Sequence, residues 1–398
     1  MDRIRQVYIV SAVRTPIGSF GGALSGLSAV ELGSRAIRAA LERAQIPGNA
    51  VDEVYYGNVI SANLGQAPAR RAALGAGIPD SVPCTLINKV CASGMKSIMI
   101  GAQSIMLGHN HIAVAGGMES MSNVPYYVPR ARFGYKFGNA ELLDGLVQDG
   151  LWDPEHQFMM GRCAEHTARE MNIGRVEQDE YAVRSYRRAA EAAEKGWFRD
   201  EIAPVEVPGK KGEKNVIEDD EEYHNVVFEK IPSLKPVFEA GGTVTAANAS
   251  TLNDGAAAVV LVSEDKLAEL DLKPIARIAG FADAAREPLW FTTAPALAIP
   301  RAIERAGLLP EQVDFYEINE AFSVVALANN RLLGLDPNRV NVFGGAVSLG
   351  HPLGASGARI VCTLESVLRH NKARYGAAGI CNGGGGASAI VLENLLST

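Results

Sequence analysis

The chain has 398 residues, of which 47% are apolar, 21% charged and 7% aromatic. An apolar fraction this high excludes a disordered protein, and the length suffices for one large domain or for two to three ordinary domains. The formal net charge of −7 argues against a protein that attracts nucleic acid electrostatically. The longest apolar run, residues 256–262, is far shorter than the about 18 residues of a membrane span. We therefore expect neither a nucleic acid nor a membrane among the partners.

The first elements predicted along the chain alternate between strand and helix. Residues 7–13 form an apolar run typical of a strand buried on both faces, and residues 51–60 return to a strand pattern. Between them, Ser28 and Glu31 have the spacing of a capping box before a helix with one apolar stripe. The chain has 41 glycines, and clusters of small residues fall between the strand-like runs, so this alternation favours an α/β fold.

Two distant parts of the chain resemble each other. Residues 41–55 read LERAQIPGNAVDEVY and residues 303–317 read IERAGLLPEQVDFYE, an offset of 262 residues. Residues 92–96 (ASGMK) and 355–359 (ASGAR) match at an offset of 263. Several matches in order at nearly one offset indicate a duplicated α/β unit. The cleft between two such halves is a usual place for a ligand.

This duplication predicts three parts. Residues 1–120 together with 243–269 form the first half, and residues 270–398 form the second. Residues 121–242 differ from both and are interpreted as an inserted loop domain. Within this insertion we expect an amphipathic helix over residues 176–198 and a charged, solvated loop over residues 210–230.

Five cysteines, at positions 84, 91, 163, 362 and 381, show no spacing typical of a disulfide framework or a zinc site. A reducing compartment is expected, and each cysteine has to be considered on its own. Cys91 directly precedes a predicted helix, where unpaired N–H groups and the helix dipole favour a thiolate. The other interpretation is a buried structural cysteine.

Three more residues suggest chemistry. His351 precedes the second ASG copy as Cys91 precedes the first, so the two would face each other; by itself it could be a polar turn residue. Cys381 ends a buried strand and opens a run of four glycines, whose N–H groups can approach a ligand. Asn319 ends another strand and could position a water or an oxyanion, or cap a helix. Together these residues predict covalent acyl chemistry, with one thiolate as nucleophile and another as base.

The same residues lie in segments by which the whole chain resembles the thiolase family. The segments are INKVCASGMK, MESMSNVPY, GTVTAANASTLNDGAAA, NEAF, GGAVSLGHPLGASGAR and CNGGGGAS. Within the family the sequence is most similar to the biosynthetic acetyl-CoA C-acetyltransferase branch, and there to the potassium-responsive eukaryotic members. The resemblance implies a thiolase fold: two similar five-stranded α/β halves in a five-layer αβαβα sandwich, with a loop domain inserted in the first half.

The resemblance also implies catalytic roles. Cys91 would accept the acyl group, with His351 as the base that activates it. Cys381 would deprotonate a second acetyl-CoA, so that a reversible Claisen condensation gives acetoacetyl-CoA and free coenzyme A. Asn319 would hold a water that forms one oxyanion hole with His351, and the N–H groups of Cys91 and Gly383 would form the other. Coenzyme A is then substrate and product, and no organic cofactor is expected.

Binding sites for coenzyme A and a potassium ion are implied in the same way. The residues that match coenzyme A contacts are Met160, Tyr186, Asn225, Val226, Val227, Lys230, Ser250 and Phe322. The residues that match the potassium site are Tyr186, through its hydroxyl, and Ala246, Ala247, Ala249 and Val347, through their carbonyl oxygens. Oxygen ligands of this kind suit an alkali cation.

Three features depart from the family pattern. Met159 stands where many biosynthetic members have a histidine beside the acyl pocket, which removes a polar contact. Asn225 and Val227 replace charged residues near the adenosine phosphate. Phe291 matches an aromatic residue associated with 2-methyl-branched substrates, but its usual proline neighbour is Thr292. Acyl preference and activity on branched substrates are therefore left open.

The resemblance further implies a homotetramer, a dimer of dimers, with residues 126–138 as the candidate assembly segment. A cytoplasmic enzyme that supplies the mevalonate and sterol pathway is expected, since neither a presequence nor a peroxisomal tripeptide is recognised; a trimmed mitochondrial form is the alternative. Two other functions stay open: a degradative 3-ketoacyl-CoA thiolase with long-chain preference, and a silent scaffold that binds coenzyme A. The related ketoacyl synthases lack a second catalytic cysteine, so Cys381 argues against them.

Overall fold

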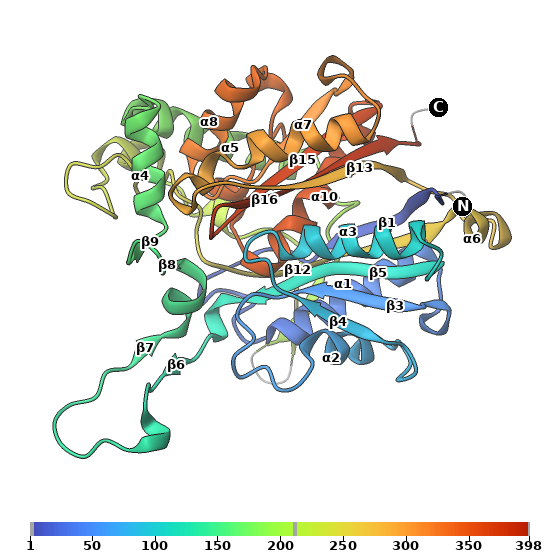
Figure 1. Ribbon diagram of the computed structural model, residues 1–398, viewed down its shortest axis with the longest axis horizontal. Coiled ribbons are helices and arrows are strands. Elements are labelled where there is room, and N and C mark those ends of the chain that lie inside the picture. The colour runs from blue at the N-terminus through green and yellow to red at the C-terminus, as the bar shows by residue number, and fades with distance from the viewer. Residues whose placement is uncertain (1–3, 210–212, 397–398) are drawn as a thin grey trace.

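The computed structural model describes residues 4–209 and 213–396. Its strands join in one large mixed sheet, in the order β14-β15-β16-β13-β1-β12-β5-β3-β4, with β2 paired to β12 (Figure 1). These strands are β1 (Val7–Arg14), β2 (Gly18–Ser19), β3 (Glu53–Gly57), β4 (Cys84–Ile87), β5 (Ile112–Ser120), β12 (Asn253–Ser263), β13 (Ala276–Ala285), β14 (Phe315–Ile318), β15 (Tyr375–Asn382) and β16 (Gly386–Asn394).

The sheet consists of two halves that meet where β1 touches β13. β1 pairs with β12 along its whole length, but with β13 only at Tyr8 and Ile9. In the N-terminal half β3 is parallel to both β4 and β5, and in the C-terminal half β14 is parallel to β15. β12 lies between β1 and β5, so the chain returns to the N-terminal half after its long middle segment. The division into three domains by residue number stays a prediction.

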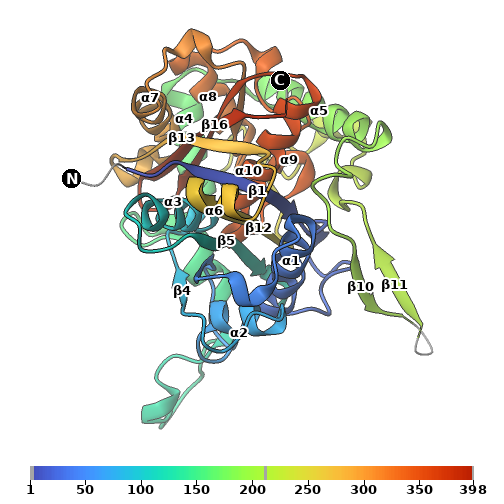
Figure 2. The ribbon, with the colours of Figure 1, turned by 90° about the vertical axis from the view of Figure 1, so that its right-hand side faces the viewer.

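Helices form three layers around the two halves (Figures 1 and 2). α1 (Ala29–Ala44) and α2 (Pro68–Gly75) cover the outer face of the N-terminal half, and α7 (Pro295–Arg305), with α8 (Ser323–Leu333) beside it, covers the outer face of the C-terminal half. α3 (Ser93–Met106) and α10 (Leu353–His370) pack against each other between the halves. The predicted αβαβα sandwich is thereby confirmed.

The two ASG motifs lie where α3 and α10 cross. A Cβ atom on Gly94 would lie 2.8 Å from Ala358 N, and one on Gly357 would lie 2.5 Å from Met95 N. Glycine at both positions therefore allows the two helix backbones to touch. Cys91 and His351 each stand two residues before the first residue of their helix. The crossing consequently brings them to the same end of the helix pair.

Two local predictions can be compared with the structure. The capping box of α1 is present, because Ser28 N donates to Glu31 Oε2 at 2.9 Å and Glu31 N to Ser28 Oγ at 3.3 Å. The strand predicted over residues 51–60 is shorter, since β3 ends at residue 57. Beyond it, the N–H groups of Val59 and Ile60 donate to the side-chain carboxylate of Glu119, at 3.0 and 3.3 Å, and not to the backbone of a neighbouring strand.

The middle of the chain is built of short hairpins and two longer helices. Its elements are β6 (Tyr126–Tyr127), β7 (Leu143–Asp144), β8 (Trp152–Asp153), β9 (Phe158–Met159), α4 (Gly161–Glu170), α5 (Arg175–Glu194), β10 (Val205–Pro208) and β11 (Lys214–Ile217); α6 (Glu264–Glu269) and α9 (Ala346–Leu349) complete the helices of the described residues. The hairpin of β6 and β7 projects as an arm in Figure 1.

The helix predicted over residues 176–198 is α5, which ends at Glu194. Within the predicted loop 210–230, residues 210–212 lie outside the described part, and β11 pairs with β10 so that Ile217 lies opposite Val205. Among the described residues, no helix is both long and apolar enough to cross a membrane.

Candidate active site

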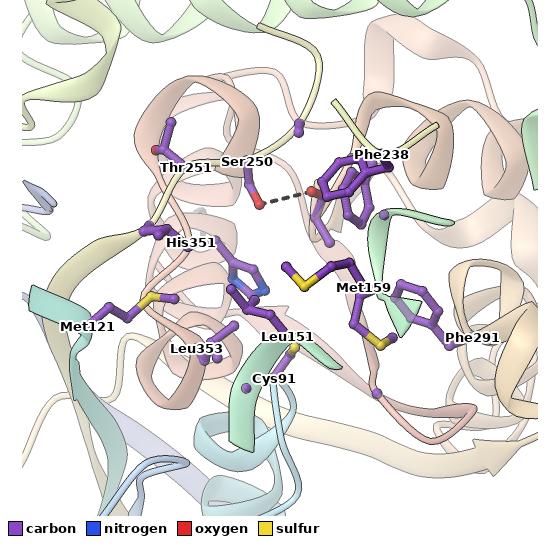
Figure 3. A pocket seen from close by; sticks show the side chains of 18 residues that line it. Cys91, Met121, Leu151, Met159, Phe238, Ser250, Thr251, Phe291, His351 and Leu353 are labelled. Carbon is purple, nitrogen blue, oxygen red and sulfur yellow. Dashed lines mark hydrogen bonds between the residues drawn. The ribbon is translucent and has the colours of Figure 1, made fainter. Parts of the chain in front are cut away.

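A cavity of about 120 Å³ opens where the two halves and the middle segment meet, and its wall is almost wholly apolar. Cys91 and His351 point into it (Figure 3). Its lining consists of Cys91, Met121, Gly150, Leu151, Met159, Met160, Gly161, Phe238, Ala249, Ser250, Thr251, Leu252, Phe291, Ala321, Phe322, His351, Leu353 and Gly383. Gly150, Leu151 and Phe238 were not predicted as site residues, because no motif marks them and only the fold brings them here.

Cys91 is held in a strained turn between β4 and α3. The preceding residue, Val90, has φ = +48°, a left-handed conformation that a β-branched residue rarely adopts. Val90 N donates to Asn88 Oδ1 at 3.0 Å, and Val90 O accepts a bond of 2.6 Å from the Ser93 hydroxyl. Strain of this kind costs about 1–3 kcal/mol and persists only where its surroundings enforce it. The turn therefore holds the cysteine in one place. The sequence did not predict this turn, because the residue with positive φ is a valine and not a glycine.

The Cys91 sulfur accepts hydrogen bonds from the backbone N–H of Gly383 and from its own N–H. Burial nevertheless raises the pKa of the Cys91 thiol to about 11. The predicted stabilisation of a thiolate by the helix is therefore wrong for the free protein, because α3 begins only at Ser93 and loss of hydration outweighs the N–H groups. Cys91 is a thiol at neutral pH and needs a base.

The hydrogen bonds of His351 determine which of its nitrogens can act as that base. Its Nδ1 lies 2.6 Å from Ser356 Oγ, and the Ser356 hydroxyl donates to Pro352 O at 2.9 Å. Since the serine proton is used there, Nδ1 carries the imidazole proton and Nε2 has a free lone pair. Nε2 is buried without a partner among the described residues. Burial, with a smaller effect of the Arg359 charge, lowers the pKa of His351 to about 3, so the ring is neutral.

Cys381 and Asn319 lie close to the site without lining the cavity. Cys381 is buried in one apolar cluster with Phe291 and Phe322, which do line it. Burial raises the pKa of Cys381, and negative charge on Cys91 raises it further, so the two sulfurs are near each other. Asn319 follows β14, whose partner β15 ends in Cys381 and Asn382. It caps no helix, because α8 begins at Ser323.

The predicted coenzyme A residues fall into two groups. Met160, Ser250 and Phe322 line the cavity, and the Ser250 hydroxyl donates to Ala321 O at 2.9 Å (Figure 3). The others lie away from it: residues 225–227 and Lys230 belong to a largely exposed surface segment, and Tyr186 is buried on α5.

Two of the three departures from the family pattern can be placed at the cavity. Met159 and Phe291 are part of its wall, so the cavity has a methionine where many biosynthetic members have a histidine, together with the phenylalanine that matches the family aromatic. Thr292 is turned away, with its hydroxyl 2.6 Å from that of Thr167.

The potassium residues surround a buried, negatively charged region. Ala247, Ala249 and Val347 are buried and Ala246 is exposed. Burial raises the pKa of the Tyr186 hydroxyl, and the carboxylates of Glu222 and Glu320 raise it further. Both carboxylates are themselves buried. The sequence analysis did not single out these two glutamates.

Comparison with known proteins agrees with this geometry. Residues 7–265 match the N-terminal domain of thiolase and residues 272–394 match its C-terminal domain. The chain is 58% identical to an acetyl-CoA acetyltransferase of Schizosaccharomyces pombe, covering 98% of this chain and 99% of the relative. It is 56% identical to a mitochondrial acetyl-CoA acetyltransferase of Bos taurus, covering 98% and 92%. A crystal structure of a thiolase from Ascaris suum in complex with coenzyme A superposes with a TM-score of 0.93 at 49% identity, covering 98% of this chain and all of that one. The protein belongs to the thiolase family.

Proposed function

We propose that this protein is an acetyl-CoA C-acetyltransferase, which condenses two molecules of acetyl-CoA to acetoacetyl-CoA and coenzyme A through an acetyl group on Cys91. The observation that carries this proposal is the meeting of the Cys91 thiol, the Gly383 N–H and the neutral His351 ring at one apolar cavity. The names of the relatives and their identity over nearly the whole chain support the same activity.

The first half-reaction uses the residues at the cavity wall. His351 Nε2 takes the proton of Cys91, and the thiolate attacks the thioester carbonyl of the first acetyl-CoA. The N–H groups of Cys91 and Gly383 stabilise the negative oxygen of the tetrahedral intermediate. The bond to the coenzyme A sulfur then breaks, and that sulfur leaves with the proton from His351. Acetyl-Cys91 is a thioester, so the acetyl group keeps the reactivity it had on coenzyme A.

The second half-reaction needs another base. The Cys381 thiolate removes a proton from the methyl group of the second acetyl-CoA, and the carbanion attacks the carbonyl of acetyl-Cys91. The new carbon–carbon bond forms as the bond to the Cys91 sulfur breaks, which releases acetoacetyl-CoA, and the leaving Cys91 sulfur takes the proton that Cys381 holds. A water held by Asn319 stabilises the enolate oxygen, and His351 does so in the state in which its Nε2 carries a proton. Acetyl-Cys91 carries no negative charge, so it does not raise the pKa of Cys381 at the step that needs the base.

Coenzyme A would bind in two places along its length. Met160, Ser250 and Phe322 would surround its reactive end, since they line the cavity with Cys91. Residues 225–227, Lys230 and Tyr186 would contact the remainder, with the exposed Lys230 ammonium available to a phosphate group. Because Asn225 and Val227 are neutral, fewer charged side chains are available to bind the adenosine phosphate of coenzyme A.

A potassium ion would be held by Tyr186 and the carbonyl oxygens of Ala246, Ala247, Ala249 and Val347. The region fits a cation, because the buried carboxylates of Glu222 and Glu320 leave negative charge beside the Tyr186 hydroxyl. The carbonyl oxygens of Ala246, Ala247 and Ala249 accept no hydrogen bond from the described residues. When bound, the ion would supply the positive charge that this region otherwise lacks.

A homotetramer would assemble through the arm of β6 and β7. Phe133 and Phe137 on this arm are 85% and 103% exposed, which is unusual for phenylalanine outside an interface. Replacing both by serine should reduce the particle mass measured by light scattering. An unchanged mass would assign assembly to another surface.

The location and the pathway are part of the same proposal. A cytosolic acetyl-CoA acetyltransferase of Gibberella zeae is 58% identical over 99% of this chain, and a mitochondrial one of Bos taurus is 56% identical. We place this protein in the cytoplasm, where acetoacetyl-CoA would feed mevalonate and sterol synthesis. Cell fractionation tests this placement, and recovery with mitochondria would contradict it.

The experiment that tests the activity is intact mass after brief incubation with acetyl-CoA, together with an assay of released coenzyme A. One acetyl group on Cys91, discharged by added coenzyme A, is the expected result. Binding of coenzyme A without an adduct would favour the silent scaffold. Activity on acetoacetyl-CoA against a longer 3-ketoacyl-CoA separates the proposal from a degradative long-chain thiolase.

A further inference from the structure

A buried arginine, Arg359, stands one helical turn after Ser356 on α10 and faces the same region of the site. Its side chain is among the largest that are fully buried, with 2% of the residue exposed. Its Nη2 lies 3.4 Å from Asn319 Oδ1. Residues three apart lie on one face of a helix, so Ser356 contacts His351 and Arg359 contacts Asn319 from the same side.

The chemistry of arginine dictates how the Asn319 amide is turned. A guanidinium group has donors and no acceptor, and it stays charged in proteins. The atom that faces it must therefore be the amide oxygen. The NH₂ group is then directed to the other side, and Asn319 Nδ2 is buried without a partner among the described residues. With the amide reversed, two donors would face each other and an acceptor would replace the donor on the far side.

An acidic side chain, that of Glu317, influences the guanidinium electrostatically. Glu317 lies on β14, two residues before Asn319, which directly follows the strand and continues its pairing by donating from its N–H to Gly379 O at 3.0 Å, so the two side chains lie on one face. Glu317 is 1% exposed. Burial lowers the pKa of Arg359 and the nearby Glu317 raises it, while burial also raises the pKa of the Glu317 carboxyl well above its usual value. Glu201 and Glu320 also raise the pKa of Arg359.

We propose that Arg359 is a positioning residue, which turns the Asn319 amide so that its NH₂ group faces the reacting enolate or the water beside it. The inference rests on the proposed function, because it concerns the donor that the second half-reaction needs. Acetylation of Cys91 uses the N–H groups of Cys91 and Gly383, which Arg359 does not touch. Loss of Arg359 should therefore affect the two half-reactions unequally.

The test measures the two half-reactions separately in the full-length protein. Acetylation of Cys91 is followed by rapid-quench mass spectrometry, and enolate formation by exchange of the acetyl-CoA methyl hydrogens with deuterated water. In Arg359→Met paired with Glu317→Gln, which removes the guanidinium together with the acidic group near it, exchange should fall at least about tenfold, since loss of one oxyanion donor costs about 10²–10³-fold. Acetylation should change by less than about threefold, within the range of an indirect effect.

Two further variants separate positioning from stability. Arg359→Lys keeps a donor-only cation, so exchange should recover relative to the paired variant. Arg14→Lys is the matched control, since Arg14 is also buried and paired with carboxylates, Glu201 and Asp220, but contacts none of the site residues. It should leave the ratio of exchange to acetylation unchanged.

The last experiment asks whether the effects of the paired variant and of Asn319→Ala on exchange add up. In an Asn319→Ala background, the paired variant should lower exchange no further than about twofold, because the residue through which Arg359 acts is absent. Full additivity, or an equal loss of acetylation and exchange, would overturn the inference. If the paired variant does not fold, the inference is tested with Arg359→Lys. The measurements are its ratio of exchange to acetylation and the additivity of its effect with that of Asn319→Ala. Failure of the wild-type protein to form acetyl-Cys91 would instead refute the proposed function.

Discussion

Ser356 Oγ accepts the Nδ1 proton of His351 at 2.6 Å while its own hydroxyl donates to Pro352 O. This pair makes Nε2 the basic nitrogen, and the first prediction concerns it. In Ser356→Ala the Nδ1–H group loses its buried partner, so the other tautomer becomes accessible and kcat should fall about tenfold, in line with general base catalysis worth 10²–10⁴-fold. Steady-state kinetics and the acetylation rate check this.

The control for that variant lies on the same helix. Ser366 is also buried on α10, and its Oγ has no hydrogen-bond partner among the described residues. Ser366→Ala should therefore leave kcat unchanged. Equal losses in the two variants would mean that any change in the packing of α10 lowers activity, and that the tautomer is not at issue.

The two cysteines should behave differently when each is replaced. Cys91→Ala should form no acetyl-enzyme, because Cys91 is the only thiol among the described residues that line the cavity. Cys381→Ala should still be acetylated at Cys91 but should neither condense nor exchange methyl hydrogens. Intact mass and deuterium exchange distinguish the two. Full condensation by Cys381→Ala would show that another group is the base.

The crossing of α3 and α10 predicts an effect at a distance from the chemistry. In Gly357→Ala the new Cβ would lie 2.5 Å from Met95 N, so the helices must separate and move Cys91 away from His351. We expect a loss of about 1–3 kcal/mol in stability, as for other overpacked cores, and a fall in acetylation rate of more than tenfold, since a small displacement of reacting groups costs about 10²-fold. Gly174→Ala, where a Cβ meets nothing within 4 Å, is the control. An acetylation rate near wild type in Gly357→Ala would contradict the role of this contact.

The pH dependence of stability should report the buried imidazole. The pKa of His351 is about 3 in the folded protein against 6.5 for the free side chain, so the unfolded chain binds the proton more readily. The stability that comes from a neutral His351 is complete above pH 6.5 and is lost as the pH falls from 6.5 towards 3, by about 1.4 kcal/mol per pH unit at most. Urea unfolding at pH 7 and pH 5 should show a smaller loss in His351→Gln than in the wild type.

The comparison with this variant is needed because other groups titrate in the same range. Burial raises the pKa values of Glu119 and Glu365 to about 7, and their contribution has the opposite sign: it is lost as the pH rises. Both carboxyls are present in wild type and variant, so they cancel in the difference. Identical pH profiles for the two proteins would show that His351 is not buried as a neutral ring.

The potassium site can be tested by stability as well as by activity. Replacing sodium chloride by potassium chloride at equal ionic strength should raise both the melting temperature and kcat, because the ion would offset the charges of Glu222 and Glu320. Tyr186→Phe removes one oxygen ligand while keeping the aromatic packing, and should abolish most of this response. A wild-type protein indifferent to the cation would refute the assignment of Tyr186 and the neighbouring carbonyls.

Much of the architecture was predictable because it depends on residues that are close together in the sequence. The capping box at Ser28 needs only a hydroxyl and a carboxylate three residues apart. The ASG repeat indicated two equivalent helices, and helix equivalence was enough to predict that Cys91 and His351 meet. The ends of elements were less predictable. β3 stops early because Glu119, which lies 60 residues further along the chain than Val59, accepts the N–H groups that would have continued it.

The sequence by itself determined the duplicated α/β fold and the family, and it singled out Cys91, Cys381 and His351 as the candidate reacting groups, since these depend on spacing and on side-chain chemistry. Only the tertiary structure decided the state of those groups. The pKa of Cys91 is raised where the helix end alone predicted that it falls, because burial is a property of everything packed around the sulfur. The neutral tautomer of His351, the strained turn at Val90 and the contact of Arg359 with Asn319 likewise depend on atoms that meet only after folding, and no local pattern specifies which atoms those are.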